Sequence, residues 1–161
     1  MARDVVDRDL GFKKIIKDLE NSTKFSVRIG IQEGAKVVPQ QIGERKSEAG
    51  ASVAQYAAYN EFGTRTIPER SFMRTAFDEN LTRIESIVSY QYNLTLEGQQ
   101  TFQQTLGIIG QVIVGMIQRK IGQIHSPPNA PSTIEKKGSS KPLIDFGQMI
   151  KSVTYVVRKD R

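Results

Sequence analysis

The fold depends on one stretch near the middle of the chain, residues 59–74, which reads Tyr59-Asn60-Glu61-Phe62-Gly63-Thr64-Arg65-Thr66-Ile67-Pro68-Glu69-Arg70-Ser71-Phe72-Met73-Arg74. Gly63 predicts the end of a helix, because glycine adopts the left-handed conformation that closes helices without a steric penalty. A second helix is expected after Pro68, since proline is tolerated at the start of a helix and disfavoured inside one. Two large apolar side chains, Phe62 and Phe72, flank the charged loop between them. The stretch therefore predicts a corner between two helices.

The corner is rich in charge and lacks the side-chain sets of a catalytic site. Glu61 is accompanied by three arginines, and no nucleophile with a base, metal-ligand cluster or phosphate-binding loop stands beside them. This combination favours assembly over catalysis. We expect residues 59–74, called the docking corner below, to contact another subunit, with Phe62 and Phe72 buried in the monomer or at the interface. The interface residues expected are Glu61, Phe62, Gly63, Thr64, Arg65, Ile67, Pro68, Arg70, Phe72 and Arg74.

The N-terminal side of the corner predicts two helices and a strand. Residues 52–62 form an alanine-rich helix that ends at the corner, whereas glycine, proline and polar residues over 32–50 predict a flexible loop. Apolar residues alternate with polar ones over Phe25–Ile31, which is typical of a half-buried strand. Leucines, isoleucines and a phenylalanine at helical spacing predict an amphipathic helix from Leu10 to about Asn21.

The C-terminal side predicts two long helices, a loop and a strand. The helices are expected over Ser71 to about Leu94 and over about Gln99 to Ile124, and a flexible loop without core residues over 125–142. Asp145 is expected to cap a short helical turn. Alternation over Val153–Val157 predicts a final strand, paired with residues 25–31 or with a strand in the loop after them.

Four glycines, Gly107, Gly110, Gly115 and Gly122, interrupt the second long helix. Each lowers its intrinsic stability by up to about 1 kcal/mol. The favoured explanation is the close approach of another helix or of the sheet, and a hinge is the alternative.

Composition is consistent with a single α+β domain over residues 1–161, with a small antiparallel sheet packed against two long helices, shorter N-terminal and central helices, and long extended loops. The chain has 161 residues, no cysteine and a net charge of +6. Its mean hydropathy of −0.39 is low for a compact protein, so partner subunits are expected to contribute to its stability. Neither a secretory signal nor a membrane-spanning stretch is recognisable in it.

Catalysis and metal binding have weak support in the sequence. His125 is the sole histidine and is interpreted as a helix C-cap, because no nucleophile motif accompanies it. An enzyme working through Glu61 and His125 remains the least favoured hypothesis. The acids Glu61, Glu69, Asp78 and Glu79 match no metal-binding spacing and are expected to pair with arginines or with water. We expect no cofactor and no metal.

The excess of basic residues leaves nucleic-acid binding open as the alternative function. Flexible lysines and arginines attract phosphates without reading sequence. The residues that would line a DNA channel or contact a partner are Arg45, Lys46, Lys136, Lys137 and Lys141. Since no recognition-helix, zinc-knuckle or stacking motif is present, contact with DNA is expected to be non-specific.

Three blocks of the sequence resemble the tail-component and virion-morphogenesis families of tailed bacteriophages, which include neck and tail-completion proteins that join head to tail. The first block is Val53–Thr64 followed by Ile67–Met73, similar to the family signature Glu-Phe-Gly-Thr, then Ile-Pro-x-Arg-x-Phe. The second is Pro131–Ile134 with Lys137-Gly138, and the third is Pro142–Met149 followed by Ser152-Val153. Ser71 departs from a frequent proline, and Phe146 from a small polar residue.

The resemblance implies a structural, non-enzymatic α+β protein of the virion, assembled in the host cytoplasm and located at the neck or upper tail. It implies a homo-oligomeric ring, with a hexamer favoured and a dodecamer as the alternative. The neighbours implied are head-completion or connector proteins and tail-terminator or tail-tube proteins. Passing viral DNA is a further non-specific contact that the basic side chains allow.

Overall fold

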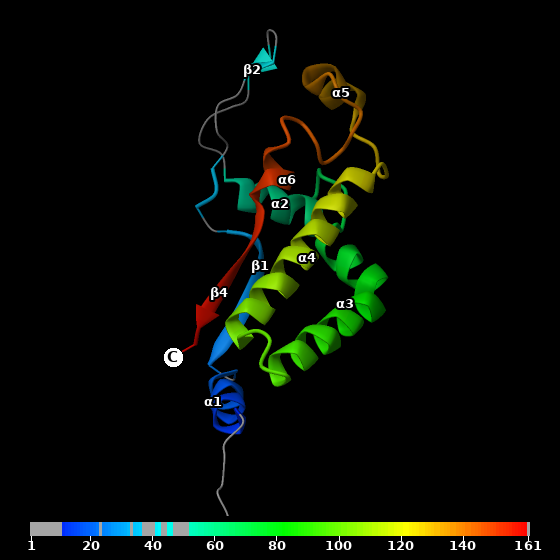
Figure 1. The fold of residues 1–161 in the computed structure, drawn as a ribbon. Coiled ribbons are helices and arrows are strands. Elements are labelled where there is room, and N and C mark those ends of the chain that lie inside the picture. Colours follow the sequence, from blue (N-terminus) through cyan, green and yellow to red (C-terminus); the bar gives the residue numbers. More distant parts are fainter. Residues whose placement is uncertain are drawn as a thin grey trace, which may run out of the picture.

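Two long helices and a two-stranded ribbon form the centre of the α+β fold, with one of the helices between the other helix and the ribbon (Figure 1). The computed structural model describes residues 11–160 except 23, 33, 37–40, 43, 44 and 47–51. The elements are α1 (Phe12–Ser22), β1 (Phe25–Ile31), β2 (Gln41–Ile42), β3 (Arg45–Lys46), α2 (Val53–Phe62), α3 (Met73–Leu96), α4 (Phe102–Gln123), α5 (Pro131–Lys137), α6 (Gln148–Ser152) and β4 (Val153–Lys159).

The ribbon consists of β1 and β4, which pair antiparallel over seven residues each. The register runs from Phe25 opposite Lys159 to Ile31 opposite Val153. Of the two partners that the sequence left open for the last strand, the structure selects residues 25–31. Within the loop predicted over 32–50, the short strands β2 and β3 pair with each other, and much of the rest lies outside the described residues.

Helices α3 and α4 form an antiparallel pair with contacts at both ends. At the turn, the hydroxyl oxygens of Thr95 and Thr105 lie 2.5 Å apart. At the other end, the Lys120 ammonium donates to Glu79 at 2.6 Å. Helix α4 begins with a capping box, in which Thr101 and Gln104 each accept from the other's backbone N–H.

The core lies around α4, which buries one residue after another along its length. Its best-buried members include Ile117 and Ile121, and they belong to one core cluster with Phe72, Ala76, Val53 and Met149 from the surrounding elements. Burial on several sides gives α4 the role of a central helix, whereas α3 buries only Ala76 and Thr95 among its residues.

Tyr155 explains one of the four glycines in α4. A Cβ atom at Gly110 would lie 2.7 Å from the Tyr155 Cγ, and one at Gly107 would lie 3.8 Å from its hydroxyl oxygen. The predicted close approach of the sheet is therefore confirmed at Gly110, whereas the distance at Gly107 is an ordinary van der Waals contact that leaves room for a Cβ atom. At Gly115 and Gly122 no described atom lies within 4 Å of such a Cβ, and nothing in the structure explains these glycines.

The structure corrects two predictions for the C-terminal third. Residues 125–142 are not a continuous loop without core residues, because α5 forms there with Pro131 in its first turn and the left-handed Gly138 at its end, and Pro142 is buried. The N-cap position of the next helix is Gly147 rather than Asp145, since α6 begins at Gln148. The signals for α5 were in the sequence, but its seven residues show no apolar periodicity.

Candidate docking corner

The docking corner is a tight turn that depends on Gly63. Helix α2 ends at Phe62, and Gly63 follows with φ of 72°. A Cβ atom there would lie 3.0 Å from the backbone nitrogen of Glu69, so the position excludes larger residues on both conformational and steric grounds. Thr64 closes the loop, because its N–H donates to the Ile67 carbonyl at 2.7 Å and its hydroxyl oxygen accepts from the Ile67 N–H at 2.9 Å.

Glu61 caps the start of α3 from the end of α2. Its carboxylate accepts from the backbone N–H groups of Phe72 and Met73, both at 2.8 Å, and of Arg74 at 3.0 Å. It also accepts from the Ser71 hydroxyl at 3.0 Å. The first N–H groups of a helix have no partner within it, and α3 has no cap from its own N-cap residue. One carboxylate thus satisfies three such groups and places a negative charge at the positive end of the helix dipole.

The environment of Glu61 keeps its carboxyl ionised. Its side chain is almost fully buried, and burial by itself raises the pKa. Hydrogen bonds from the Met73, Arg74 and Phe72 backbone and from the Ser71 hydroxyl outweigh that effect, so the pKa of Glu61 lies below its ordinary value. The charge has a structural use here, and both oxygens are occupied.

Arg70 connects the corner to the chain beyond α4. Its guanidinium donates to the carbonyls of Pro127 at 2.7 Å and Pro128 at 2.9 Å. It also donates to the side-chain oxygens of Asn60 at 3.2 Å and Asn129 at 3.3 Å. The side chain is buried, and burial lowers the pKa of Arg70. A planar group with five donors fits this set of neutral oxygens, which an ammonium group cannot reach together.

The exposed part of the corner is aromatic and basic. Phe62 is 67% exposed, and the Arg74 guanidinium carbon lies 5.4 Å from the centre of its ring, in the range of a cation–π contact. Tyr59, one turn earlier on α2, is 41% exposed. Arg74 is held in place by Glu69, whose carboxylate accepts from its Nη2 at 2.5 Å. We call Tyr59, Phe62 and Arg74 the aromatic surface of the corner.

The structure divides the predicted interface residues into an inner and an outer group. Glu61, Arg70 and Phe72 were assigned to contacts with another subunit or to burial, and all three side chains are buried within the chain. For Glu61 and Arg70 this corrects the expectation that they face a partner, because helix N–H groups and loop carbonyls inside the chain use their polar atoms. The outer group, exposed or half-buried, consists of Phe62, Gly63, Thr64, Arg65, Ile67, Pro68 and Arg74.

Sequence reasoning missed the inner role of Glu61 although a signal for it existed. Helix α3 starts after Phe72, and no Ser, Thr, Asp or Asn stands at that N-cap position to accept from the helix N–H groups. Glu61 stands at the end of the preceding helix. The contacts between Arg70 and residues 127–129 had no sequence signal, since 57 to 59 positions separate them.

Of the five basic residues proposed for DNA or partner contact, the three with described side chains lie on α5 or just after it. Lys136 and Lys141 are exposed on and after α5. The Lys137 ammonium donates to the carbonyls of Lys141 and Pro142 at 3.0 and 3.1 Å, which connects the end of α5 to the segment after it. The side chains of Arg45 and Lys46 lie outside the described residues.

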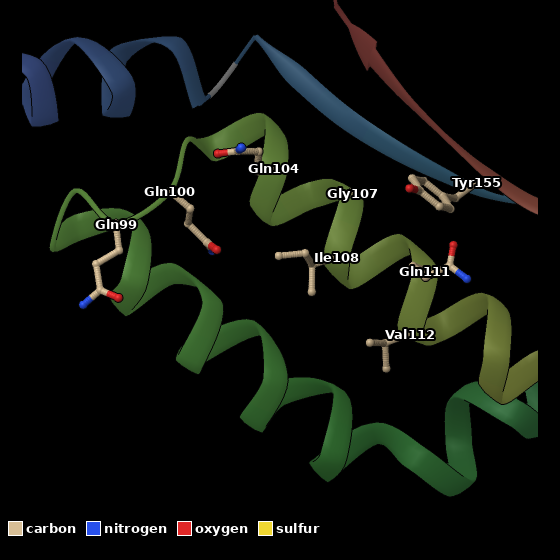
Figure 2. Close-up of a pocket in the computed structure, with 8 residues that line it drawn as sticks. All are labelled: Gln99, Gln100, Gln104, Gly107, Ile108, Gln111, Val112 and Tyr155. Carbon is tan, nitrogen blue, oxygen red and sulfur yellow. The ribbon is translucent and has the colours of Figure 1, made fainter.

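A groove of about 710 Å³ lies beside α4 (Figure 2). Amides, aliphatic groups and one phenol line it, and these groups offer no acid and base pair for catalysis. The lining residues are Gln99, Gln100, Gln104, Gly107, Ile108, Gln111, Val112 and Tyr155. Within the described ranges, no group of three or more acids or histidines is placed to hold a metal ion. His125 is exposed, just after the end of α4.

Comparisons of the chain with models of protein families, with curated proteins and with solved structures find no match. Across the part of the chain that the structure describes, no helix is long and apolar enough to cross a membrane.

Proposed function

We propose that the protein is a structural component of a tailed-bacteriophage virion, located at the neck or upper tail, where it forms a ring that joins head to tail. The three sequence blocks that resemble the neck and tail-completion families support this proposal. The first of them coincides with the docking corner, and its Glu, Gly, Arg and second Phe are the residues that hold the corner in shape.

One observation carries the proposal: Phe62 is exposed on a corner whose backbone is fixed. Glu61 hydrogen-bonds the start of α3, and Arg70 hydrogen-bonds residues 127–129, so both fix the corner in place. An exposed phenylalanine costs solubility without contributing to the core, and aromatic side chains with arginine are enriched where protein partners bind. Because the corner is already ordered, docking against it loses little conformational entropy.

The proposed ring needs two different surfaces on each subunit. Heterologous contacts close into a ring when the rotation between neighbours divides a full turn evenly. The resemblance favours a hexamer, with a dodecamer as the alternative. Head-completion or connector proteins on one side, and tail-terminator or tail-tube proteins on the other, are the proposed neighbours.

Particles made without the protein test the role. Deletion of its coding sequence from the phage is expected to leave DNA-filled heads and separate tails, visible by negative-stain electron microscopy. Normal joined particles without the protein would contradict the proposal.

Complementation with variants then tests the corner. Phe62→Ala should restore joining poorly, whereas Tyr90→Ala should restore it fully, because Tyr90 has a similar exposed fraction of 61% but lies on α3 away from the corner. Equal rescue by both variants would show that the aromatic surface has no part in docking.

A further inference from the structure

The two outer layers of the fold carry opposite charge. Helix α4 lies between α3 on one side and the β1–β4 ribbon on the other, so α3 and the ribbon each turn an outer face away from α4 (Figure 1). The chain as a whole has a net charge of +6. Helix α3 departs from that excess, because its segment contains three acids against two arginines.

The outer face of the ribbon carries two arginines and one acid around a small apolar centre, and the acid, Asp160, accepts from the Ser26 hydroxyl at 3.0 Å. Tyr155 and Val153 contact the core, and side chains alternate between the two faces of a strand. Arg28 therefore lies opposite Val156 on the outer face, and Arg158 is two residues further along the same face. Both arginines are exposed and Val156 is half-buried. We call Arg28, Val156 and Arg158 the basic face.

The outer side of α3 has an apolar centre with two acids beside it, and Arg74, one turn before Asp78 on the same side, is paired with Glu61 and Glu69. Leu81 is 56% exposed and Phe77, one turn earlier, is 37% exposed. Asp78 and Glu85, three residues before and four residues after Leu81, project from the same side of the helix and are exposed. We call Phe77, Asp78, Leu81 and Glu85 the acidic face.

We propose that the acidic face of one copy docks on the basic face of the next copy and forms the lateral contact of the ring. This inference rests on the proposed ring. The contact places Leu81 against Val156, with Asp78 and Glu85 near Arg28 and Arg158. Two different faces on opposite sides of the same subunit make a heterologous contact, the kind that a ring requires. Complementary charge sets the orientation and the association rate, and the contact weakens as salt screens it.

Charge reversal on each face separately provides the test. Arg28→Glu/Arg158→Glu removes the basic face, and Asp78→Lys/Glu85→Lys removes the acidic face. Each double variant is expected to raise the dissociation constant of self-association about tenfold or more, measured by sedimentation velocity at low salt. Lys14→Glu/Lys17→Glu on α1 is the matched control, because it changes the net charge by the same amount as the first variant and leaves both faces intact.

Mixing the variants distinguishes this contact from other modes of association. Each double variant has two faces of the same sign, and both find a complementary face on the other variant, so an equimolar mixture should regain the assembly that neither variant shows alone. A chain with all four substitutions has the charges exchanged and should regain the wild-type assembly. Circular dichroism of each variant checks that it folds.

The failure of this inference and the failure of the ring give different results. If the wild-type chain assembles and both double variants assemble with the same affinity, the lateral contact is elsewhere and the ring stands. If the wild-type chain remains monomeric at high concentration and low salt in this assay, and is also absent from purified virions, both proposals are overturned.

Discussion

Replacing Glu61 by glutamine tests whether this carboxylate holds the docking corner together. Glutamine keeps the shape of the side chain and replaces one carboxylate oxygen by an NH₂ group. One oxygen accepts from the Phe72 and Met73 N–H groups, and the other accepts from the Arg74 N–H, the Arg74 Nε and the Ser71 hydroxyl. Whichever way the amide turns, at least one helix N–H then faces another donor.

The magnitude follows from these contacts. A buried donor left without an acceptor costs about 1–3 kcal/mol, and the lost charge at the helix N-terminus costs about 0.3–1 kcal/mol more. We therefore expect Glu61→Gln to lower the free energy of unfolding by about 2–3 kcal/mol. At this chain length, that corresponds to a fall in Tm of about 4–12 °C.

Urea unfolding followed by circular dichroism, at a protein concentration low enough to avoid self-association, measures the effect. Glu135→Gln is the matched control, because Glu135 is exposed on α5 and its loss should change stability by less than about 0.5 kcal/mol. Equal stability of Glu61→Gln and wild type at pH 7 would refute the reasoning.

The pH dependence provides a second readout of the same carboxylate. The pKa of Glu61 is lower in the folded chain than its ordinary value of 4.5, so the unfolded chain takes up the proton first as the pH falls. The stabilisation is therefore fully present above the ordinary pKa and is lost as the pH falls through the folded one. Glutamine does not titrate, so the stability difference between wild type and Glu61→Gln should shrink below about pH 4.5. A difference that stays constant down to pH 2 would contradict this assignment.

Three further experiments test other parts of the structure. Arg70→Lys should lower the free energy of unfolding by about 2 kcal/mol and make residues 127–129 more sensitive to limited proteolysis, because a lysine cannot reach the same four oxygens. Unchanged cleavage would show that Arg70 does not hold residues 127–129 in place. Gly110→Ala should destabilise the folded chain by about 1–3 kcal/mol, because the new methyl group clashes with the Tyr155 ring. Gly115→Ala should stabilise it by up to about 1 kcal/mol, because no described atom lies near the new methyl group. Thermal unfolding that ranks the two variants the other way would contradict the packing described. Phe72→Ala should lower the free energy of unfolding by about 3–5 kcal/mol, because Phe72 is fully buried. Phe62→Ala should lower it by less than about 1 kcal/mol, because Phe62 is 67% exposed. Similar losses for both variants in denaturant unfolding would refute this difference.

Local patterns in the sequence predicted most elements of the fold. The alternation over 25–31 and 153–157 predicted β1 and β4, and the glycine and proline of the corner predicted where α2 ends and α3 follows. These features depend on neighbouring residues, which share a helix face, a strand face or a turn. Helix α5 was missed for the same reason, since its seven residues contain a single large apolar side chain, Ile134, and so no periodicity to read.

The amino-acid sequence by itself determined the α+β class, the two long helices, the corner at residues 59–74 and the excess of positive charge. Tertiary structure alone decided which side chains of that corner are available to a partner. Glu61 and Arg70 are charged, and the sequence predicted both at the surface. In the folded chain Glu61 accepts from helix N–H groups and Arg70 donates to the carbonyls of residues 127 and 128, so both side chains are used inside the chain. Phe62 is apolar and looked suited to burial, yet Gly63 turns the chain at a point that leaves it in solvent. Such roles follow from contacts between distant residues, which the order of neighbours does not specify.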